Sequence, residues 1–179
     1  MAHPEDITAQ MGPVIAAPEG KLLRGLTQLG EGEHWVIEPQ QLDGTGKLWS
    51  PGVRAGVRPG SEYHLTEYFG PILGVMTAET LEEAIELQNA PEYGLTAGLH
   101  SLNSEELALW LDRVQAGNVY VNRGITGAIV RRQSFGGWKK SSVGTGTKAG
   151  GPSYLMALGE WTSRPSAAIA TPSAEPVKE

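Results

Sequence analysis

The chain has 179 residues, a length typical of one domain and sufficient to bury a core. Its composition, 40% hydrophobic and 19% charged, excludes disorder throughout the chain. A formal net charge of −6 argues against nucleic acid as a partner, and the absence of cysteine excludes disulfides and thiolate metal sites.

The first third of the chain predicts a helix followed by strands. Leucines at helical spacing predict a helix over 18–29, which the glycines of 30–32 end. The apolar run 35–38 is typical of a strand, and the turn residues after it make 35–50 resemble a hairpin. The stretch 52–57 continues the strand pattern, although its glycines weaken a strand.

The middle of the chain predicts three strands, at 71–76, 95–100 and 118–122. The first of these is a continuous apolar run, which is the pattern of a strand buried on both faces. Helical segments separate the strands. This alternation predicts an α/β fold in which a parallel or mixed sheet carries helices on its faces.

Two capping patterns set the beginnings of these helices. Thr80 and Glu83 form a capping box, in which the hydroxyl and the carboxylate satisfy backbone N–H groups. Pro91 ends the first helix. Ser104 is predicted to cap the second helix, and Gly117 fits its C-terminal stop.

The last part of the chain is rich in glycine and then in proline and alanine. Residues 123–153 are predicted to be loop, and 156–161 to form a last strand. The composition of 163–179 predicts a disordered tail, so the folded domain is expected over 1–162. No run is long enough to cross a membrane and no signal peptide is visible, which favours a cytoplasmic location.

The loop after the third strand of the middle region is a candidate binding site. Ligands of parallel sheets bind beyond the carboxyl ends of the strands, where residues 123–128 lie. Gly124 and Gly127 allow backbone N–H groups to approach an anion such as a carboxylate. The alternative is a tight turn that binds nothing, and spacing alone favours the turn.

Glu67 and Phe69 form a second candidate site. Two residues apart in extended chain, they point to the same side. A carboxylate accepts hydrogen bonds from a sugar diol, while an aromatic ring packs against a flat heterocycle. Spacing alone favours an ordinary glutamate at a strand edge. The four histidines have no ligand-like spacing, so no metal site is expected.

Several segments resemble one known family. Residues 67–71 are similar to the E-x-F-G-P motif of the aldehyde dehydrogenase superfamily. The segments 120–130, 135–139 and 149–155 resemble the L-glutamate γ-semialdehyde (1-pyrroline-5-carboxylate) dehydrogenase branch, including the dehydrogenase part of bifunctional proline utilisation proteins. The likeness extends over about residues 5–161. It implies a partial catalytic domain of α/β class with a C-terminal oligomerisation strand.

The resemblance implies roles for five residues. Glu67 would hold the nicotinamide ribose of NAD, and Phe69 would lie near the nicotinamide. The backbone of Gly127 and Ala128 would anchor the α-carboxylate of the substrate. Phe135 would pack against the aliphatic stem of that substrate.

The family reaction depends on a cysteine, which this chain lacks. In the family the thiolate attacks the aldehyde, hydride passes to NAD, and water hydrolyses the acyl intermediate. The resemblance places the cysteine, the general-base glutamate, the oxyanion asparagine and the NAD-binding domain upstream of the matched region. We therefore expect no turnover by this chain alone.

Three functional hypotheses stay open. The first, which we favour, is a semialdehyde dehydrogenase fragment that retains substrate and cofactor contacts. The second is half of a split enzyme, and the third is a non-catalytic interaction subunit. In each case uncovered strand edges and apolar surface predict a partner. We expect that partner to be a second copy or an upstream dehydrogenase half, and the segment 156–161 to pair subunits.

Overall fold

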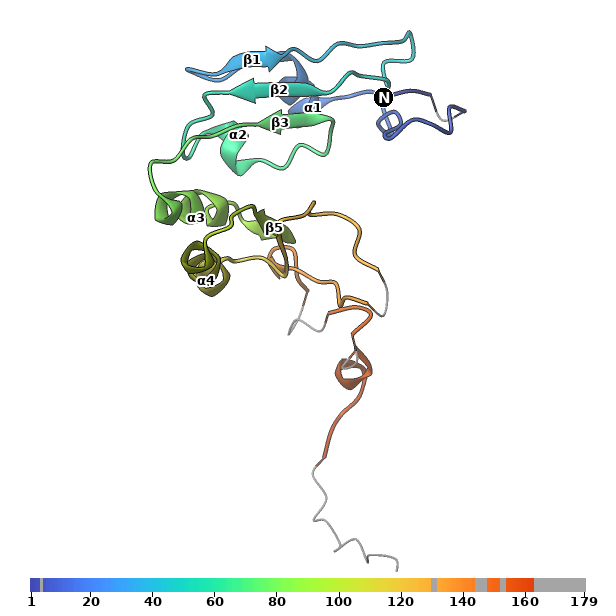
Figure 1. The fold of residues 1–179 in the computed structure, drawn as a ribbon. Helices are drawn as coiled ribbons and strands as arrows, with labels where there is room; N and C mark the ends of the chain where they lie inside the picture. The colour runs from blue at the N-terminus through green and yellow to red at the C-terminus, as the bar shows by residue number, and fades with distance from the viewer. Residues whose placement is uncertain (4, 130–131, 144–147, 152–153, 163–179) are drawn as a thin grey trace, which may run out of the picture.

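The computed structural model describes residues 1–3, 5–129, 132–143, 148–151 and 154–162. Figure 1 shows two lobes in this part of the chain, which we call the sheet lobe and the helix lobe. The sheet lobe consists of α1 (Gly20–Thr27), β1 (His34–Ile37), β2 (Gly52–Ala55), α2 (Glu62–Leu65) and β3 (Ile72–Gly74). The helix lobe contains α3 (Leu81–Asn89), β4 (Tyr93–Gly94), β5 (Thr96–Leu99), α4 (Ser104–Arg113), β6 (Asn118–Val121) and β7 (Trp138–Lys139). The short 3-10 helix η1 (Tyr154–Leu158) follows.

The three-stranded sheet has the order β1-β2-β3, with β1 antiparallel and β3 parallel to β2. The predicted hairpin over 35–50 is therefore wrong, because β1 pairs with 52–55. Pro39 has no N–H to donate to a ladder, so the pairing of β1 stops before it. Within the intervening segment, Gln41 and Trp49 form an isolated antiparallel bridge.

A buried ion pair lies at the centre of the sheet lobe. The side chains of Arg54 and Glu33 are each 2% exposed, and Nη1 donates to Oε2 at 2.6 Å. The guanidinium carbon lies 3.9 Å from the ring centroid of Tyr63 and 4.5 Å from that of Trp35. Arg54 also donates to the Gly25 carbonyl in α1. The core of this lobe is thus assembled around a charged pair with aromatic walls.

The stacked tyrosines beside this pair predict a loss of stability at high pH. Burial raises the pKa of the Tyr63 and Tyr68 phenols above 10.0, and the Arg54 guanidinium offsets part of that rise. The folded protein then holds these protons more tightly than the unfolded chain does. Their stabilising contribution is complete below the unfolded pKa and is lost as pH rises through the folded pKa.

We expect an ultraviolet titration to show the Tyr63 and Tyr68 phenols ionising above their ordinary pKa, and the free energy of unfolding to fall above about pH 10. Tyr63→Phe and Tyr68→Phe should each remove one late-ionising phenol. A late phase that stays unchanged in both variants would contradict the expectation.

The helix lobe contains the predicted crossover arrangement. β5 and β6 are parallel, with register from Thr96↔Asn118 to Leu99↔Val121. Helices α3 and α4 cover one face of this pair, around a core that consists of Ile85, Ala97, Trp110 and Val114. The α/β class is confirmed for this lobe.

The expected continuous parallel sheet is wrong, because β3 belongs to a different sheet from β5 and β6. Nor is β3 buried on both faces, since Leu73 is 58% exposed. β3 lies at the edge of its three-stranded sheet, so no further described strand covers it. The apolar run 71–76 is therefore less buried by the described residues than its sequence predicts.

The helix caps differ in detail from the expectation. Thr80 accepts from the N–H of Glu83 at 3.1 Å as predicted, but the Glu83 carboxylate accepts from the N–H of Glu79 instead of that of Thr80. At α4 the cap is Asn103, whose side-chain oxygen accepts from the N–H of Glu105. Asn103 has extended backbone angles, whereas Ser104 is already helical, so the asparagine occupies the N-cap position.

The expected strand over 156–161 is wrong. Residues 154–158 form η1, and Figure 1 shows this segment, in orange, extending away from both lobes. Among the described residues it has no strand partner, and Leu155 and Trp161 are exposed. The predicted tail, 163–179, lies outside the described residues. Within the described part of the chain, every helix is too short or too polar to cross a bilayer, and the cytoplasmic location stays a prediction.

Candidate functional site

A cavity of 640 Å³ lies on the face of β5 and β6 that α3 and α4 leave uncovered. We call it the anchor-loop cavity. It is lined by Leu95, Thr96, Tyr120, residues 125–129, Gln133, Phe135, Ala149 and Gly150. Three of the predicted site residues, Gly127, Ala128 and Phe135, are therefore brought together here.

The floor of this cavity follows from the alternation of β6. Val119 and Val121 pack toward the helices. Asn118 and Tyr120 consequently point to the opposite face, where both are buried at 4% exposure. Sequence reasoning treated this strand only as structure and missed both residues. The available signal was the alternation of Asn118 and Tyr120 with valines, which places both polar side chains on one face of the strand.

The anchor loop over 123–128 turns sharply at Gly127, where φ is +85°. Glycine adopts this angle at no steric cost. The Arg123 guanidinium donates to the Thr126 carbonyl at 3.2 Å and lies 5.0 Å from the ring centroid of Tyr120. The N–H groups of Gly127 and Ala128 donate to no other described residue, so they are available to an acceptor in the cavity.

Asn118 fixes the segment that carries Phe135. Its Nδ2 donates to the Ser134 carbonyl at 2.9 Å, and its Oδ1 accepts from the N–H of Gly136 at 3.0 Å. Phe135 itself exchanges two backbone hydrogen bonds with Ala149. The backbone on both sides of the aromatic ring is therefore held, and the ring is directed to the cavity wall.

Gly117 permits the close approach of this segment. A β-carbon at Gly117 would lie 1.8 Å from the Gly136 carbonyl oxygen. The Lys148 ammonium donates to the Gly117 carbonyl. The expectation that Gly117 stops the helix is wrong, because α4 ends at Arg113 and the extended Val114 is its C-cap. Gly117 instead sets the distance between β6 and the Phe135 segment.

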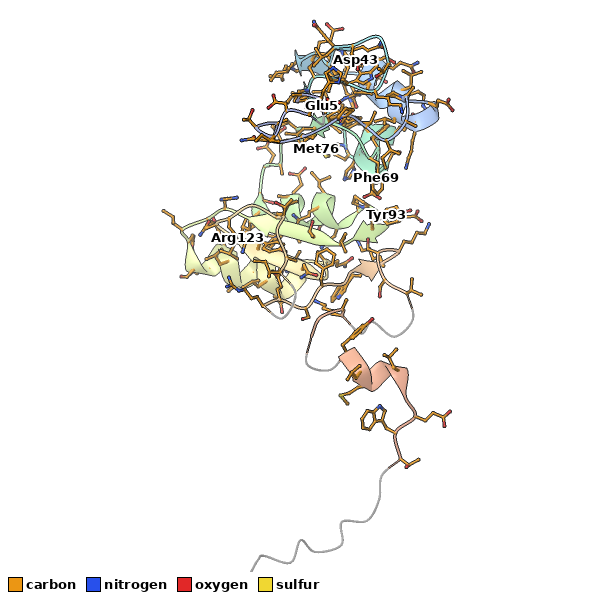
Figure 2. The ribbon with its side chains drawn as sticks, turned by 90° about the vertical axis from the view of Figure 1, so that its right-hand side faces the viewer. Glu5, Asp43, Phe69, Met76, Tyr93 and Arg123 are labelled. Carbon is orange, nitrogen blue, oxygen red and sulfur yellow. The ribbon has the colours of Figure 1, made fainter. Side chains whose placement is uncertain are left out.

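Glu67 and Phe69 line a separate hollow of 290 Å³ in the sheet lobe. Both are exposed while Tyr68 between them is buried. The condition on which their shared side was predicted, an extended segment, is not met at Phe69. Phe69 has a φ of +57° and is 78% exposed, and Figure 2 shows it on the side of the sheet lobe that faces the helix lobe. None of the residues lining this hollow lines the anchor-loop cavity.

The Glu67 hollow fits one end of a dinucleotide. An exposed carboxylate can accept two hydrogen bonds from a ribose diol, and an exposed ring can pack against a nicotinamide. A bulky residue at positive φ is unusual, and such backbone is typical of positions held for a specific purpose. The residues present therefore fit the nicotinamide ribose, and the rest of NAD needs a surface beyond these two side chains.

One histidine, His64, links the two lobes. His64 accepts from the N–H of Gly60 at Nδ1 and makes a 2.8 Å hydrogen bond from Nε2 to the Leu87 carbonyl. This links α2 of the sheet lobe to α3 of the helix lobe. Within the part of the chain that the structure describes, no three His, Asp or Glu side chains form a metal-binding group.

Comparison with known proteins agrees with this architecture. A 1-pyrroline-5-carboxylate dehydrogenase from Geobacillus sp. (strain WCH70) is 37% identical over 157 residues, which cover 87% of this chain and 30% of that protein. The structure of proline utilization A from Corynebacterium freiburgense matches with a TM-score of 0.87 and 54% identity, over 93% of this chain and 17% of that one. A Thermus 1-pyrroline-5-carboxylate dehydrogenase with bound NAD matches with a TM-score of 0.70 and 36% identity, over 81% of this chain and 28% of that one.

These matches define what the chain represents. It spans about 30% of the length of the curated relatives that it matches. The profile of the aldehyde dehydrogenase family matches residues 1–163. The chain therefore belongs to the aldehyde dehydrogenase family, as the part of the domain that carries the anchor loop.

Proposed function

We propose that this chain supplies the substrate-carboxylate and nicotinamide-side contacts of an NAD-dependent L-glutamate γ-semialdehyde dehydrogenase of proline catabolism, and that it does not turn over alone. The observation that carries the proposal is the anchor-loop cavity, which gathers Gly127, Ala128 and Phe135. The names of the relatives support the same substrate class.

The anchor loop would bind the α-carboxylate of the substrate. The N–H groups of Gly127 and Ala128 donate no hydrogen bond to another described residue. Two such donors suit the two oxygens of one carboxylate. Phe135 would cover the aliphatic stem and exclude water from it. The clamp of Asn118 on both neighbours of Phe135 keeps the ring in place without help from the ligand.

Glu67 and Phe69 would contact the cofactor. NAD, when bound, accepts the hydride that the aldehyde carbon loses. Glu67 would accept hydrogen bonds from the ribose hydroxyls, and Phe69 would pack beside the nicotinamide ring. Both side chains are exposed and therefore accessible to a ligand.

The chain has no thiol, so the nucleophile must come from another polypeptide segment. A serine would be a poorer nucleophile near neutral pH and a poorer leaving group for the acyl step. The fragment hypothesis therefore predicts binding without turnover.

A split enzyme is the second candidate, and one surface favours it. Ile37, Val53 and Leu73 lie side by side across β1, β2 and β3, on the face opposite Arg54. Ile37 and Leu73 are more than half exposed. An exposed apolar row across a sheet face is a surface that a covering polypeptide stabilises. We propose the cysteine-bearing upstream half as that polypeptide, with a second copy of this chain as the alternative partner.

The test has two parts. Calorimetric titration of the purified chain with L-glutamate should show weak, millimolar binding, and pentanamide, which has the stem without the carboxylate, should not bind. NADH absorbance should stay at the blank level with NAD and L-glutamate γ-semialdehyde. The split-enzyme hypothesis predicts that it rises when a cysteine-bearing upstream half of a relative is added.

Each result is decisive for one hypothesis. Turnover by the pure chain would refute the fragment hypothesis. Absence of L-glutamate binding at millimolar concentration would favour the interaction subunit. Binding without rescue by the upstream half would exclude the split enzyme.

A further inference from the structure

The Tyr120 hydroxyl is a buried polar group without a partner. The residue is 4% exposed, and its hydroxyl makes no hydrogen bond to any described residue. Buried hydroxyls are normally paired, because leaving one unpaired forfeits its hydrogen bonds to water. An unpaired hydroxyl is therefore a feature that calls for a function.

The position of Tyr120 connects this hydroxyl to the anchor-loop cavity. The residue lines the cavity, on the face of β6 opposite Val119 and Val121. Its apolar neighbours in the lining include Leu95, Ile125 and Phe135, whose side chains carry no hydrogen-bonding group. The lining also holds the polar side chains of Thr96, Thr126 and Gln133, but none of them is hydrogen-bonded to the hydroxyl. A molecule that enters the cavity or covers it can therefore supply the partner.

The charge beside Tyr120 favours an acceptor with negative charge. The Arg123 guanidinium lies 5.0 Å from the centroid of the Tyr120 ring, while its Nη2 holds the Thr126 carbonyl of the loop. None of the described side chains that line the cavity is charged, so none of them cancels the positive potential of Arg123 there.

We propose that the Tyr120 hydroxyl is a ligand-binding group, which donates a hydrogen bond to an oxygen of the small carboxylate held in the anchor-loop cavity. This inference rests on the proposed function and adds a specificity residue to it. Tyrosine at this position selects ligands with an acceptor oxygen over ligands of the same shape that lack one. The backbone donors of Gly127 and Ala128 lie on the anchor loop, whereas the Tyr120 hydroxyl belongs to β6. The two sets of donors therefore contact the ligand from different elements.

The test is Tyr120→Phe in the full chain, with calorimetric titration of L-glutamate and thermal unfolding as the two measurements. We expect binding about tenfold weaker, the usual loss for a hydrogen bond to a charged group. We expect an unchanged or higher melting temperature, because phenylalanine removes a hydroxyl that is unpaired without ligand. Tyr93→Phe, at an exposed position outside the cavity, should change neither quantity.

The outcomes separate this inference from the proposed function. If the unaltered chain binds L-glutamate and Tyr120→Phe binds it equally well, only the role of Tyr120 is refuted. A melting temperature lowered by several degrees would show a structural hydroxyl and refute it as well. Weaker association of Tyr120→Phe with the upstream half, at unchanged L-glutamate affinity, would assign the hydroxyl to the covering polypeptide. If the unaltered chain binds no L-glutamate, both proposals fail.

Discussion

Gly117→Ala is expected to displace the Phe135 segment from the anchor-loop cavity and to abolish carboxylate binding. The new β-carbon would lie 1.8 Å from the Gly136 carbonyl oxygen and 2.6 Å from the Gly137 α-carbon. These are backbone atoms, which cannot rotate away as a side chain does. We expect a loss of about 3 kcal/mol in the free energy of unfolding, at the upper end for overpacking. Urea unfolding and calorimetric titration with L-glutamate measure the two effects.

The matched control is Gly44→Ala. A β-carbon at Gly44 meets no atom within 4 Å, and this glycine lies outside the anchor-loop cavity. Its stability change should stay within about 0.5 kcal/mol, as for an ordinary surface substitution, with ligand affinity unchanged. Equal behaviour of the two variants would mean that the approach of β6 to the Phe135 segment is not needed.

Arg54→Met is expected to destabilise the sheet lobe by about 3–5 kcal/mol. The substitution leaves the Glu33 carboxylate buried without its cation, and it also removes the guanidinium between the rings of Tyr63 and Trp35. Glu33 additionally accepts from the N–H of Gly30, which holds the carboxylate in place. Urea unfolding followed by tryptophan fluorescence reports the effect through Trp35.

Two further variants show whether the buried charge is the cause. Arg54→Met combined with Glu33→Gln removes both charges and should recover much of the lost stability. Arg58→Met breaks the Arg58–Glu31 pair, which is 57% and 87% exposed, and should cost no more than about 1 kcal/mol. A double variant as unstable as Arg54→Met would point to lost packing instead of an unpaired charge.

Local patterns predicted the helices well and the sheets poorly. Helices α1, α3 and α4 follow from the spacing of their own apolar residues, because their hydrogen bonds are internal. A strand pairs with residues far from it in sequence, which local periodicity does not reveal. It therefore did not show that β1 pairs with β2 across the segment 38–51, or that β3 and β5 lie in different sheets. Helix α2 has four residues, which is too short for a periodic signal.

The candidate site divides in the same way. Gly127, Ala128 and Phe135 were expected together from the family resemblance, and the structure places all three on one cavity. Asn118 and Tyr120 were missed because their importance depends on what faces them, which is a tertiary property. The buried Arg54 was missed for the same reason, since an arginine in a strand is ordinarily exposed.

The apolar row of Ile37, Val53 and Leu73 has a practical consequence for producing the protein. Chains synthesised separately will adhere to one another through this strip before a complementing polypeptide reaches them. Joint expression from one transcript keeps nascent halves close together and shortens that exposure. Yield in the soluble fraction should therefore depend on the timing of synthesis as much as on the sequence itself.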